Sequence, residues 1–473
     1  MFESLFTPTE RPRIVRQGKA HLRARVNGNL ALRFSGHGLT SFAGLELVGQ
    51  FLRQLGFSQR LRRHLHGCDP AGDFSSVAVV RLIVGMLMVG ARRLWHVRHL
   101  AGDPVIQRFC GLALLPGDRT LSRWLSRCGG PVRAALQAFN GELIAEAVGR
   151  LRLKRLTIDV DGTVVSTGFT VERAFRGYNP HHRKVKSYYP ITAYLAQTGH
   201  VMRVRNRSGN VHDGKASMPF LRDLFAQIER FMGRRLKLEM RLDGAFFRPE
   251  IVAWLRTRAE YAIKVPFYPW LGLKGLIQRQ RRWTRVAIDL EAFETTVTIP
   301  TWKNRSLRVA IYRRRVQHES PKNFQLDLFD PDDGHWEYSA ITTNKPLGLT
   351  ALWKFMAGRG THEKVLGQLR NGYAFDVVPT RNFAANSTWQ ILSVLAHNLI
   401  TNFQLALAAP PRSSSSKRRS LFLLRSIHTL RYELLGRAGI VRHPEGRAML
   451  TLAPNLPTQK LFKRIVAKLA SAA

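Results

Sequence analysis

Acidic residues are scarce in this chain of 473 residues. Its 32 aspartates and glutamates stand against 74 lysines and arginines, which gives a formal net charge of +42 at pH 7. This excess runs through segments that also carry apolar residues, and it is larger than solubility requires. Because each neutralised phosphate releases condensed counterions, the composition predicts a nucleic-acid partner. A basic ribosomal-type protein or a protein of the membrane surface is the alternative.

Cysteine is nearly absent as well. Cys68, Cys110 and Cys128 are isolated, with no C-x-x-C pair, which argues against a disulfide framework or a zinc ribbon and fits a reducing compartment. His66 and Cys68 are at most half of a metal site, because no second pair lies nearby. No secretory signal opens the chain, and the most apolar stretch, 77–89, is too short to span a bilayer. We therefore expect a cytoplasmic, nucleoid-associated protein with no membrane partner.

Changes in composition and in the expected secondary structure along the chain predict several domains. Hydrophobic residues make up 45% of the sequence, which is enough for packed cores, and the length suggests two to four domains. The expected segments are a basic arm and helical DNA-binding region at 1–150, a first α/β part at 151–265, a β-rich insertion at 266–345, final core helices at 346–408, and a linker with a basic helical tail at 409–473. Asn27-Gly28 is a hairpin-turn signal within the arm.

A basic helix is expected at 118–127. Asp118 or Thr120 can cap it, and the helical spacing puts Arg119, Arg123 and Arg127 along one side. This pattern is typical of the second helix of a helix-turn-helix motif, in which these arginines contact DNA. A basic surface helix of a helical bundle explains the pattern equally well.

The order of elements in 151–265 predicts the fold class. Strand-like runs lie at 154–165, 188–196, 200–206, 237–243 and 260–265. The first three are in tandem, and expected helices at 216–232 and 248–258 lead to the fourth and fifth. Three strands followed by strand, helix and strand is the order of a ribonuclease-H-like fold. We therefore expect an α/β core, a mixed sheet flanked by helices, with the insertion between its strands and its last helices.

Three of the rare acids lie at the ends of these elements: Asp161, Asp243 and Glu363. Alternation along a strand puts Asp159 and Asp161 on one face, where two carboxylates repel unless a cation or solvent separates them. The first and fourth strands are neighbours in the expected fold, so Asp243 should lie beside Asp161. Glu363 would complete the site from a helix across the sheet.

Carboxylate oxygens of this kind suit Mg²⁺ or Mn²⁺. Two such ions about 4 Å apart can activate a nucleophilic oxygen and stabilise the leaving oxygen of a phosphoryl displacement. The sequence thus predicts a site for two ions, formed by Asp161, Asp243 and Glu363. Asp159 is either a further ligand or a structural partner.

Four stretches resemble DDE-type insertion-sequence transposases of the IS4-like superfamily, and most closely the IS1380 family. They are Ile-Asp-Val-Asp-Gly-Thr-Val-Val at 158–165, Gly-Tyr-Asn-Pro at 177–180 with 189–190 and 207–212, Leu-Asp-Gly-Ala-Phe-Phe at 242–247, and the helix around Glu363. The superfamily signature is Tyr, two residues, Arg, three residues, Glu, six residues, Lys. Arg359, Glu363 and Arg370 keep this spacing, whereas Met356 stands where the tyrosine is expected. Segments 385–386 and 396–399 also fit.

The resemblance implies roles for several of these residues. Asp161, Asp243 and Glu363 would be the catalytic triad, with Asp159 as its first member or a helper. Arg359 and Arg370 would hold phosphates near the cut end. The insertion would supply an aromatic residue that stacks on a displaced base. Trp283 and Trp302 are the candidates for this stacking, and either can instead be a core residue of a small β domain. His212 is interpreted as a structural or phosphate-side histidine.

The activity implied is that of a DNA transposase. Such an enzyme would bind terminal inverted repeats of double-stranded DNA as a homodimer, cut at the ends with metal-activated water, and join the freed 3′-OH to target DNA. One alternative is a ribonuclease-H-like nuclease without strand transfer. The other is a catalytically inactive DNA-binding derivative, which would be favoured if one of the three acids were missing.

Overall fold

The computed structural model describes residues 30, 32, 34, 38–70, 72–168, 171–177, 185–211, 214, 216–315, 336–407, 409–411 and 421–471. The chain divides into two compact units, Met1–His37 and Gly38–Ala473, and the description below concerns the second. Four features noted in the sequence lie outside the described residues: the turn at Asn27-Gly28, the motif residues 178–180, His212, and most of the linker, 412–420.

The core of the second unit contains a nine-stranded mixed sheet with the order β6-β5-β2-β7-β8-β12-β11-β10-β9. Strand β5 runs antiparallel to its neighbours β2 and β6, whereas β7 runs parallel to β2, and β8 runs parallel to β7. This is the strand order expected of a ribonuclease-H-like core, so the predicted fold class is confirmed. The core strands are β2 (Arg155–Gly162), β5 (Ile191–Leu195), β6 (Val201–Arg205), β7 (Lys237–Leu242) and β8 (Glu260–Val265).

The two faces of β2 have different chemistry. Ile158 and Val160 are fully buried in the apolar core formed with α8 (Ser217–Met232) and α9 (Pro249–Arg256), as their alternation predicts. Thr157 and Asp159 are also fully buried, but on the opposite face and among polar partners. The candidate site is built on this polar face.

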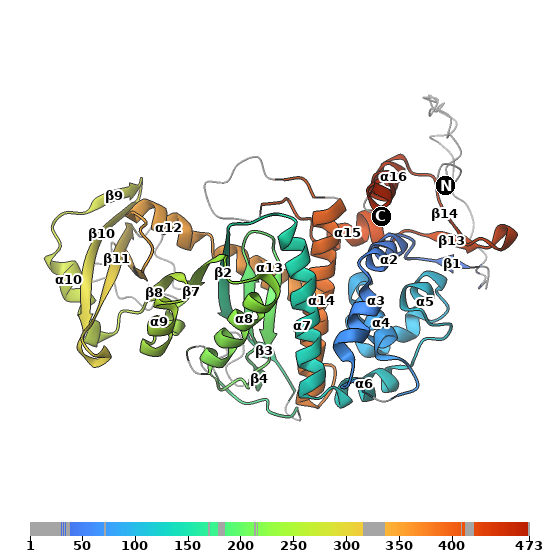
Figure 1. Cartoon of the computed structure of the whole chain (residues 1–473), viewed down its shortest axis with the longest axis horizontal. Coiled ribbons are helices and arrows are strands. Elements are labelled where there is room, and N and C mark those ends of the chain that lie inside the picture. Colours follow the sequence, from blue (N-terminus) through green and yellow to red (C-terminus); the bar gives the residue numbers. More distant parts are fainter. Residues whose placement is uncertain are drawn as a thin grey trace. The chain divides into compact units, whose positions relative to one another are not determined.

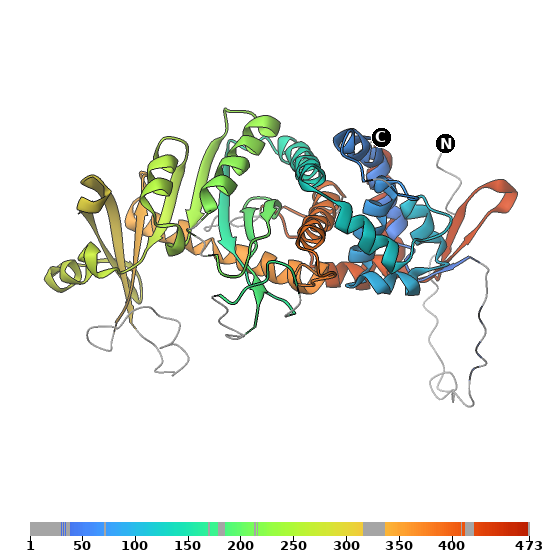
Figure 2. The same ribbon diagram turned by 90° about the horizontal axis from the view of Figure 1, so that it is seen from below.

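The β-rich insertion continues the core sheet. Strand β12 pairs antiparallel with β8, with Ala340 opposite Val265 and Thr343 opposite Ala262. Beyond β12 the sheet is extended by β11, β10 and β9, which are seen at the left of Figure 1 and Figure 2. These strands are β9 (Thr284–Ala287), β10 (Leu290–Ile299), β11 (Arg305–Arg315) and β12 (Trp336–Thr343).

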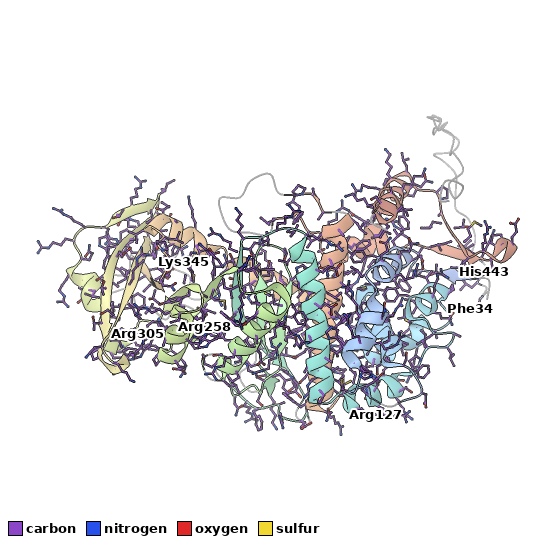
Figure 3. The ribbon with its side chains drawn as sticks, viewed as in Figure 1. Phe34, Arg127, Arg258, Arg305, Lys345 and His443 are labelled. Carbon is purple, nitrogen blue, oxygen red and sulfur yellow. The ribbon has the colours of Figure 1, made fainter. Side chains whose placement is uncertain are left out.

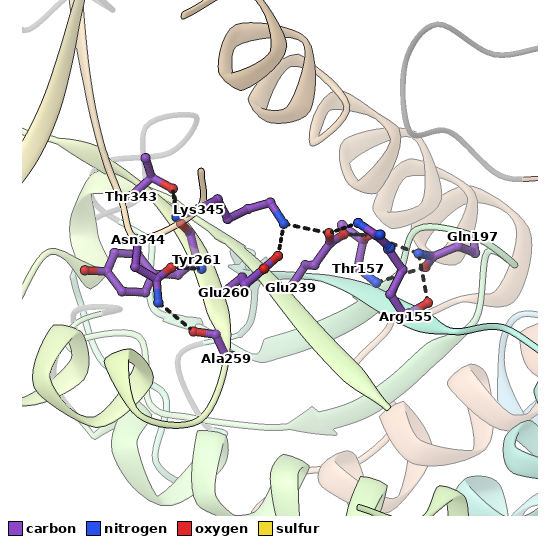
Figure 4. A network of polar contacts seen from close by, with 10 residues as sticks. All are labelled: Arg155, Thr157, Gln197, Glu239, Ala259, Glu260, Tyr261, Thr343, Asn344 and Lys345. Atoms are coloured by element: carbon purple, nitrogen blue, oxygen red, sulfur yellow. Dashed lines mark hydrogen bonds and ion pairs between the residues drawn. The ribbon is translucent and has the colours of Figure 1, made fainter. Parts of the chain in front are cut away.

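A buried polar network joins the insertion to the core (Figure 4). Glu239 on β7 has no exposed surface and accepts hydrogen bonds from Lys345 Nζ at 2.7 Å, Thr157 Oγ1 at 2.6 Å and Arg155 Nη1 at 3.0 Å. Lys345, just after β12, also contacts the Glu260 carboxylate on β8. The buried charge of Glu239 is therefore compensated from both sides of the junction.

Helix α14 (Phe383–Leu407) is buried along most of its length and packs against helices of the N-terminal region, chiefly α7, α4 and α6. Ser75 caps α4 by accepting the Ala78 N–H at 3.3 Å. No helix among the described residues is long and apolar enough to cross a membrane. The helices of this region are α2 (Leu45–Gln54), α3 (Phe57–Leu65), α4 (Ser76–Val89), α5 (Pro104–Cys110), α6 (Asp118–Arg127) and α7 (Gly130–Gly149).

Among the final core helices, the one expected around Glu363 is α13 (Gly360–Tyr373), and a separate helix, α12 (Leu349–Ala357), precedes it. The C-terminal tail differs from the sequence-based expectation. The expected helical tail contains a hairpin, β13 (Gly439–Arg442) and β14 (Met449–Leu452), before α16 (Leu456–Ser471). Strand β13 pairs with β1 (Leu39–Thr40), so this hairpin depends on a partner from the other end of the chain, which local patterns do not show.

Candidate active site

The structure brings Asp161 and Asp243 to the same edge of the sheet. Val160 on β2 is in register with Leu242 on β7 in a parallel pair. Asp161 directly follows Val160 in the sequence, and Asp243 directly follows Leu242. Parallel strands that end together present their last side chains at one edge. The side chain of Asp161 is 22% exposed and that of Asp243 is 44% exposed, so both carboxylates reach solvent.

Arg359 lies between these two carboxylates, just before α13. Its Nη2 is 2.9 Å from Asp161 Oδ2, and its Nη1 is 3.8 Å from Asp243 Oδ1. Burial of the guanidinium acts to lower its pKa, but Asp161, Asp243, Asp159 and Glu363 act against burial, and the pKa is raised above the ordinary arginine value. One cation therefore lies in the combined field of all four acids singled out in the sequence.

Glu363 is exposed in the first turn of α13, and its neighbour His362 anchors that turn to the sheet. The fully buried His362 ring stacks on Tyr194 of β5, with ring centroids 5.3 Å apart and planes 8° apart. Its Nε2 is 3.1 Å from Thr192 Oγ1. Burial, with the nearby Arg359 charge, lowers the pKa of His362 to about 3, so the ring is neutral at physiological pH. The helix start that carries Glu363 is thus fixed over β5.

Asp159 is bonded inside the protein. Arg241 of β7 donates from Nε to Asp159 Oδ1 at 2.5 Å and from Nη2 to Oδ2 at 2.7 Å, and neither side chain has exposed surface. Burial raises the pKa of Asp159, and the Arg241 charge opposes that rise. Of the two roles expected for Asp159, these contacts favour the structural partner, because both of its oxygens are engaged by one guanidinium.

Arg370, in the last turn of α13, contacts the chain that follows the first carboxylate. Its Nη2 donates to the Val164 carbonyl oxygen at 2.6 Å, two residues beyond the end of β2. The predicted contact of Arg370 with phosphate would use the rest of its guanidinium. Met356, at the position of the expected tyrosine, is partly buried against the apolar cluster under α12.

The two candidate tryptophans of the insertion are both partly or largely covered. Trp302 is only 8% exposed and packs against Phe247, with ring centroids 4.8 Å apart. Trp283 is partly buried, and the Arg313 guanidinium carbon lies 4.1 Å from the centre of its ring.

An exposed aromatic pair that the sequence patterns did not predict follows β8. Tyr268 and Trp270 are 43% and 51% exposed and stack on each other, with ring centroids 5.6 Å apart. Trp270 also lies 6.3 Å from Trp302. The Phe-Tyr-Pro-Trp run at 267–270 was the available signal, since aromatic residues beside a proline in a connection are often accessible.

Helix α6 presents its arginines to solvent. Arg119, Arg123 and Arg127 are exposed, whereas Trp124 on the opposite side is buried and donates from Nε1 to Ser76 Oγ at 2.8 Å. Figure 3 labels Arg127 at the end of this helix. Helix α6 packs on α14, whereas α5 packs on α4 and α2. This arrangement places α6 on the surface of the helical bundle, with its three arginines facing outward.

The acidic edge of the sheet fits a divalent cation by the chemistry of its donors. Asp161 and Asp243 supply hard oxygen donors from neighbouring strands, and both already lie close to the Arg359 guanidinium. Glu363 is in the first turn of α13, the helix that follows Arg359. Within the described part of the chain, no group of three or more His, Cys, Asp or Glu is close enough to form a complete metal site. Full coordination would require Glu363 to approach and the guanidinium of Arg359 to withdraw.

Comparison with known proteins gives three results. Residues 23–473 match the family model described as transposase DDE domain group 1. No curated protein matches the chain. Among solved structures, the chain is similar to a piggyBac transposase in a synaptic complex with hairpin DNA, with a TM-score of 0.43 and 9% sequence identity over 83% of this chain and 79% of that one.

Proposed function

The chain belongs to the transposase DDE domain family, and from this premise we propose that it cuts DNA at the ends of a mobile element and joins those ends to target DNA. The family uses divalent metal ions. The observation that carries the proposal is that Asp161 and Asp243, at the ends of neighbouring parallel strands, both lie beside the Arg359 guanidinium. Glu363 contributes to the negative electrostatic field at Arg359.

Asp161, Asp243 and Glu363 would hold Mg²⁺ or Mn²⁺, two ions in the completed site. When bound, such ions supply a nucleophilic oxygen at neutral pH and neutralise charge on the scissile phosphate. Arg359 is placed to bind a phosphate oxygen once its guanidinium leaves the carboxylates, and Arg370 adds charge at the other end of α13. Asp159 would support the first strand through Arg241 and not by contact with metal.

The proposed partner is double-stranded DNA, both the terminal inverted repeats and the target, with two protein copies pairing the ends. The net charge of +42 supports this assignment, since phosphate neutralisation supplies most of the affinity for duplex DNA. Arg119, Arg123 and Arg127 form an exposed basic row for that contact. Trp283 and Trp302 remain candidates for stacking on a displaced base, together with the more accessible Trp270.

The direct test is cleavage of a labelled duplex that carries the element's own terminal repeat, in Mg²⁺, Mn²⁺, Ca²⁺ or EDTA. We expect cutting at the repeat boundary in Mg²⁺ or Mn²⁺. Asp243→Asn and Asp161→Asn should abolish it while leaving binding of the repeat intact, because losing negative charge does not weaken attraction to phosphate.

The matched control is Asp223→Asn, which removes the same charge from an aspartate that is 41% exposed and paired with arginine, on α8. This variant should cut like the wild type. Cutting by Asp243→Asn would show that the triad is misassigned. Cutting without joining to target DNA would favour a nuclease, and salt-sensitive binding without cutting in any metal would favour the inactive derivative.

A further inference from the structure

Arg241 connects the elements that carry the three proposed catalytic carboxylates. It lies on β7, two residues before Asp243, and has no exposed surface. Its guanidinium donates to both oxygens of Asp159 on β2 and, from Nη1, to the Phe355 carbonyl oxygen of α12 at 2.9 Å. Three nitrogens of one side chain therefore bind groups from two other elements.

Each of these contacts lies close in the chain to a residue of the candidate site. Asp159 is two residues before Asp161 on the same strand, so the two share a face of the sheet. Phe355 is four residues before Arg359, and Gly358 lies between them. Because the guanidinium is a rigid planar fork, the two contacts fix β2 and the end of α12 relative to β7 in one geometry.

The ring of Phe355 reinforces this connection. The Arg241 guanidinium carbon lies 5.4 Å from the ring centre and Lys345 Nζ lies 5.3 Å from it, and Phe355 is only 1% exposed. Two cations thus contact one ring in a site closed to water. The position of α12 over the sheet is set by directional polar contacts as well as by apolar packing.

Stability alone is a poor explanation for a charged pair at this depth. Replacing a buried ion pair with apolar residues of similar volume is often neutral or stabilising, because ionic groups lose their hydration on burial. A fully bonded buried network does, however, specify one arrangement of the elements that it joins. Arg241 has such bonds to β2 and to α12, the elements whose alignment the candidate site requires.

We propose that Arg241 is a positioning residue: it holds β2, β7 and the end of α12 in the register that brings Asp161, Asp243 and Glu363 together around metal. This inference rests on the proposed function, since it assumes that these three carboxylates bind the ions. Arg241 itself touches neither metal nor DNA.

The test replaces the pair with apolar residues, Arg241→Met together with Asp159→Leu. We expect thermal unfolding close to that of the wild type. The affinity for Mn²⁺, measured by electron paramagnetic resonance on the protein with its terminal-repeat duplex, should fall about 10- to 100-fold, as for other residues that orient metal ligands. Cleavage should fall in parallel and recover in part at high Mn²⁺, and duplex binding should stay unchanged.

The matched control is Glu239→Leu with Arg155→Met, which removes a buried carboxylate and its ion pair on the same face but leaves Lys345 paired with Glu260 and in contact with the Phe355 ring. This variant should keep wild-type affinity for Mn²⁺. If Arg241→Met with Asp159→Leu does not fold, Arg241→Lys serves in its place. Lysine keeps the charge but cannot bind Asp159 and Phe355 as a fork, so Mn²⁺ affinity should still fall.

Wild-type Mn²⁺ affinity in a folded Arg241 variant would overturn the positioning role. The proposed function is read separately from Asp243→Asn. If that variant also binds Mn²⁺ and cuts, the metal site itself is misassigned and this inference fails with it. If Asp243→Asn is inactive while the Arg241 variants are normal, only the positioning role fails.

Discussion

At the scale of single residues, the two arginines that contact the aspartates of β2, Arg241 and Arg359, differ in their freedom to move. Arg241 is fully buried and bonded through three nitrogens. The Arg359 side chain is 17% exposed, and its Nε has no hydrogen-bond partner in the described part of the chain. Arg359 also lies in the short connection between α12 and α13. Arg241 is therefore built to stay in place, whereas Arg359 can give up its position to another cation.

This difference predicts the effect of Arg359→Gln. Without its charge, Asp161 and Asp243 repel each other, so in EDTA the free energy of unfolding should fall by about 1–3 kcal/mol. That is less than for a fully buried pair, because the Asp243 side chain is 44% exposed. Added Mg²⁺ should restore most of the loss, and Mn²⁺ should bind more tightly than to the wild type. Thermal unfolding with and without metal measures this.

Arg359→Lys is the control, since it keeps a positive charge between the carboxylates and should lose little stability in EDTA. An equal loss of stability for Arg359→Gln with and without Mg²⁺ would mean that the guanidinium has only a packing role.

Single residues also show how far the sequence predicts the site. Asp161 and Asp243 could be placed side by side because each follows an apolar strand run, and the order of strands makes those strands neighbours. Arg241 could not be recognised. Its role depends on Asp159 and Phe355, which come from other elements, and nothing in its own neighbourhood of sequence shows that the charge is buried.

At the scale of elements, the edge strand β6 is covered by side-chain amides from surrounding helices. Asn398 of α14 accepts the Val201 N–H at 2.9 Å and donates to the Val201 carbonyl oxygen at 2.8 Å. Gln137 of α7 donates to the Val204 carbonyl oxygen at 2.5 Å. Backbone groups of an exposed edge would otherwise be open to another strand. The segment 396–399 was noted in the sequence only through resemblance, and the structure gives it this packing role.

Two buried histidines lie where α14 packs against β6, and they predict that the fold is less stable at acid pH. Burial, as the main cause, lowers the pKa of His200 to about 3 and that of His397 to about 4. An unfolded histidine binds its proton near pH 6.5, so between pH 6.5 and about 4 the unfolded state binds more protons. The free energy of unfolding should therefore decrease as pH falls through this window, by about 1.4 kcal/mol per pH unit for each histidine.

Urea unfolding at pH 7.5, 6 and 5 measures this slope. His200→Gln should reduce the slope by the contribution of one histidine, about 1.4 kcal/mol per pH unit, because glutamine does not titrate. The same slope in the variant would show that His200 does not contribute to acid sensitivity.

Helix α6 offers a second prediction at this scale. Arg119→Glu with Arg123→Glu should weaken binding to duplex DNA and reduce the slope of log affinity against log salt concentration by about 2, one for each lost phosphate contact. Fluorescence anisotropy from low to moderate salt measures both quantities.

Lys460→Glu with Arg464→Glu on α16 changes the net charge by the same amount at two other exposed positions. If both double variants behave alike, the effect is one of overall charge and α6 makes no specific contact with DNA.

At the scale of the whole second unit, the insertion and the core share one sheet. The change of texture at 266 predicts a β-rich insertion but does not show where its strands pair. Its last strand returns to β8, and the pairing between Ala340 and Val265 depends on chain geometry that local patterns do not contain. Lys345 then closes the junction by binding Glu239, a carboxylate of the core that has no exposed surface.

This continuity predicts that core and insertion unfold together. Lys345→Met should lower the free energy of unfolding by about 3 kcal/mol, since it removes the ammonium group that binds the fully buried carboxylate of Glu239. Hydrogen exchange should show faster exchange in β10 and β11 of the insertion and in β5 and β7 of the core by similar factors. Arg314→Met, which breaks an exposed pair with Glu337, is the control and should cost about 1 kcal/mol or less. If Lys345→Met speeds exchange only in the insertion strands, the shared sheet does not transmit stability across β8, and the insertion unfolds as a unit of its own.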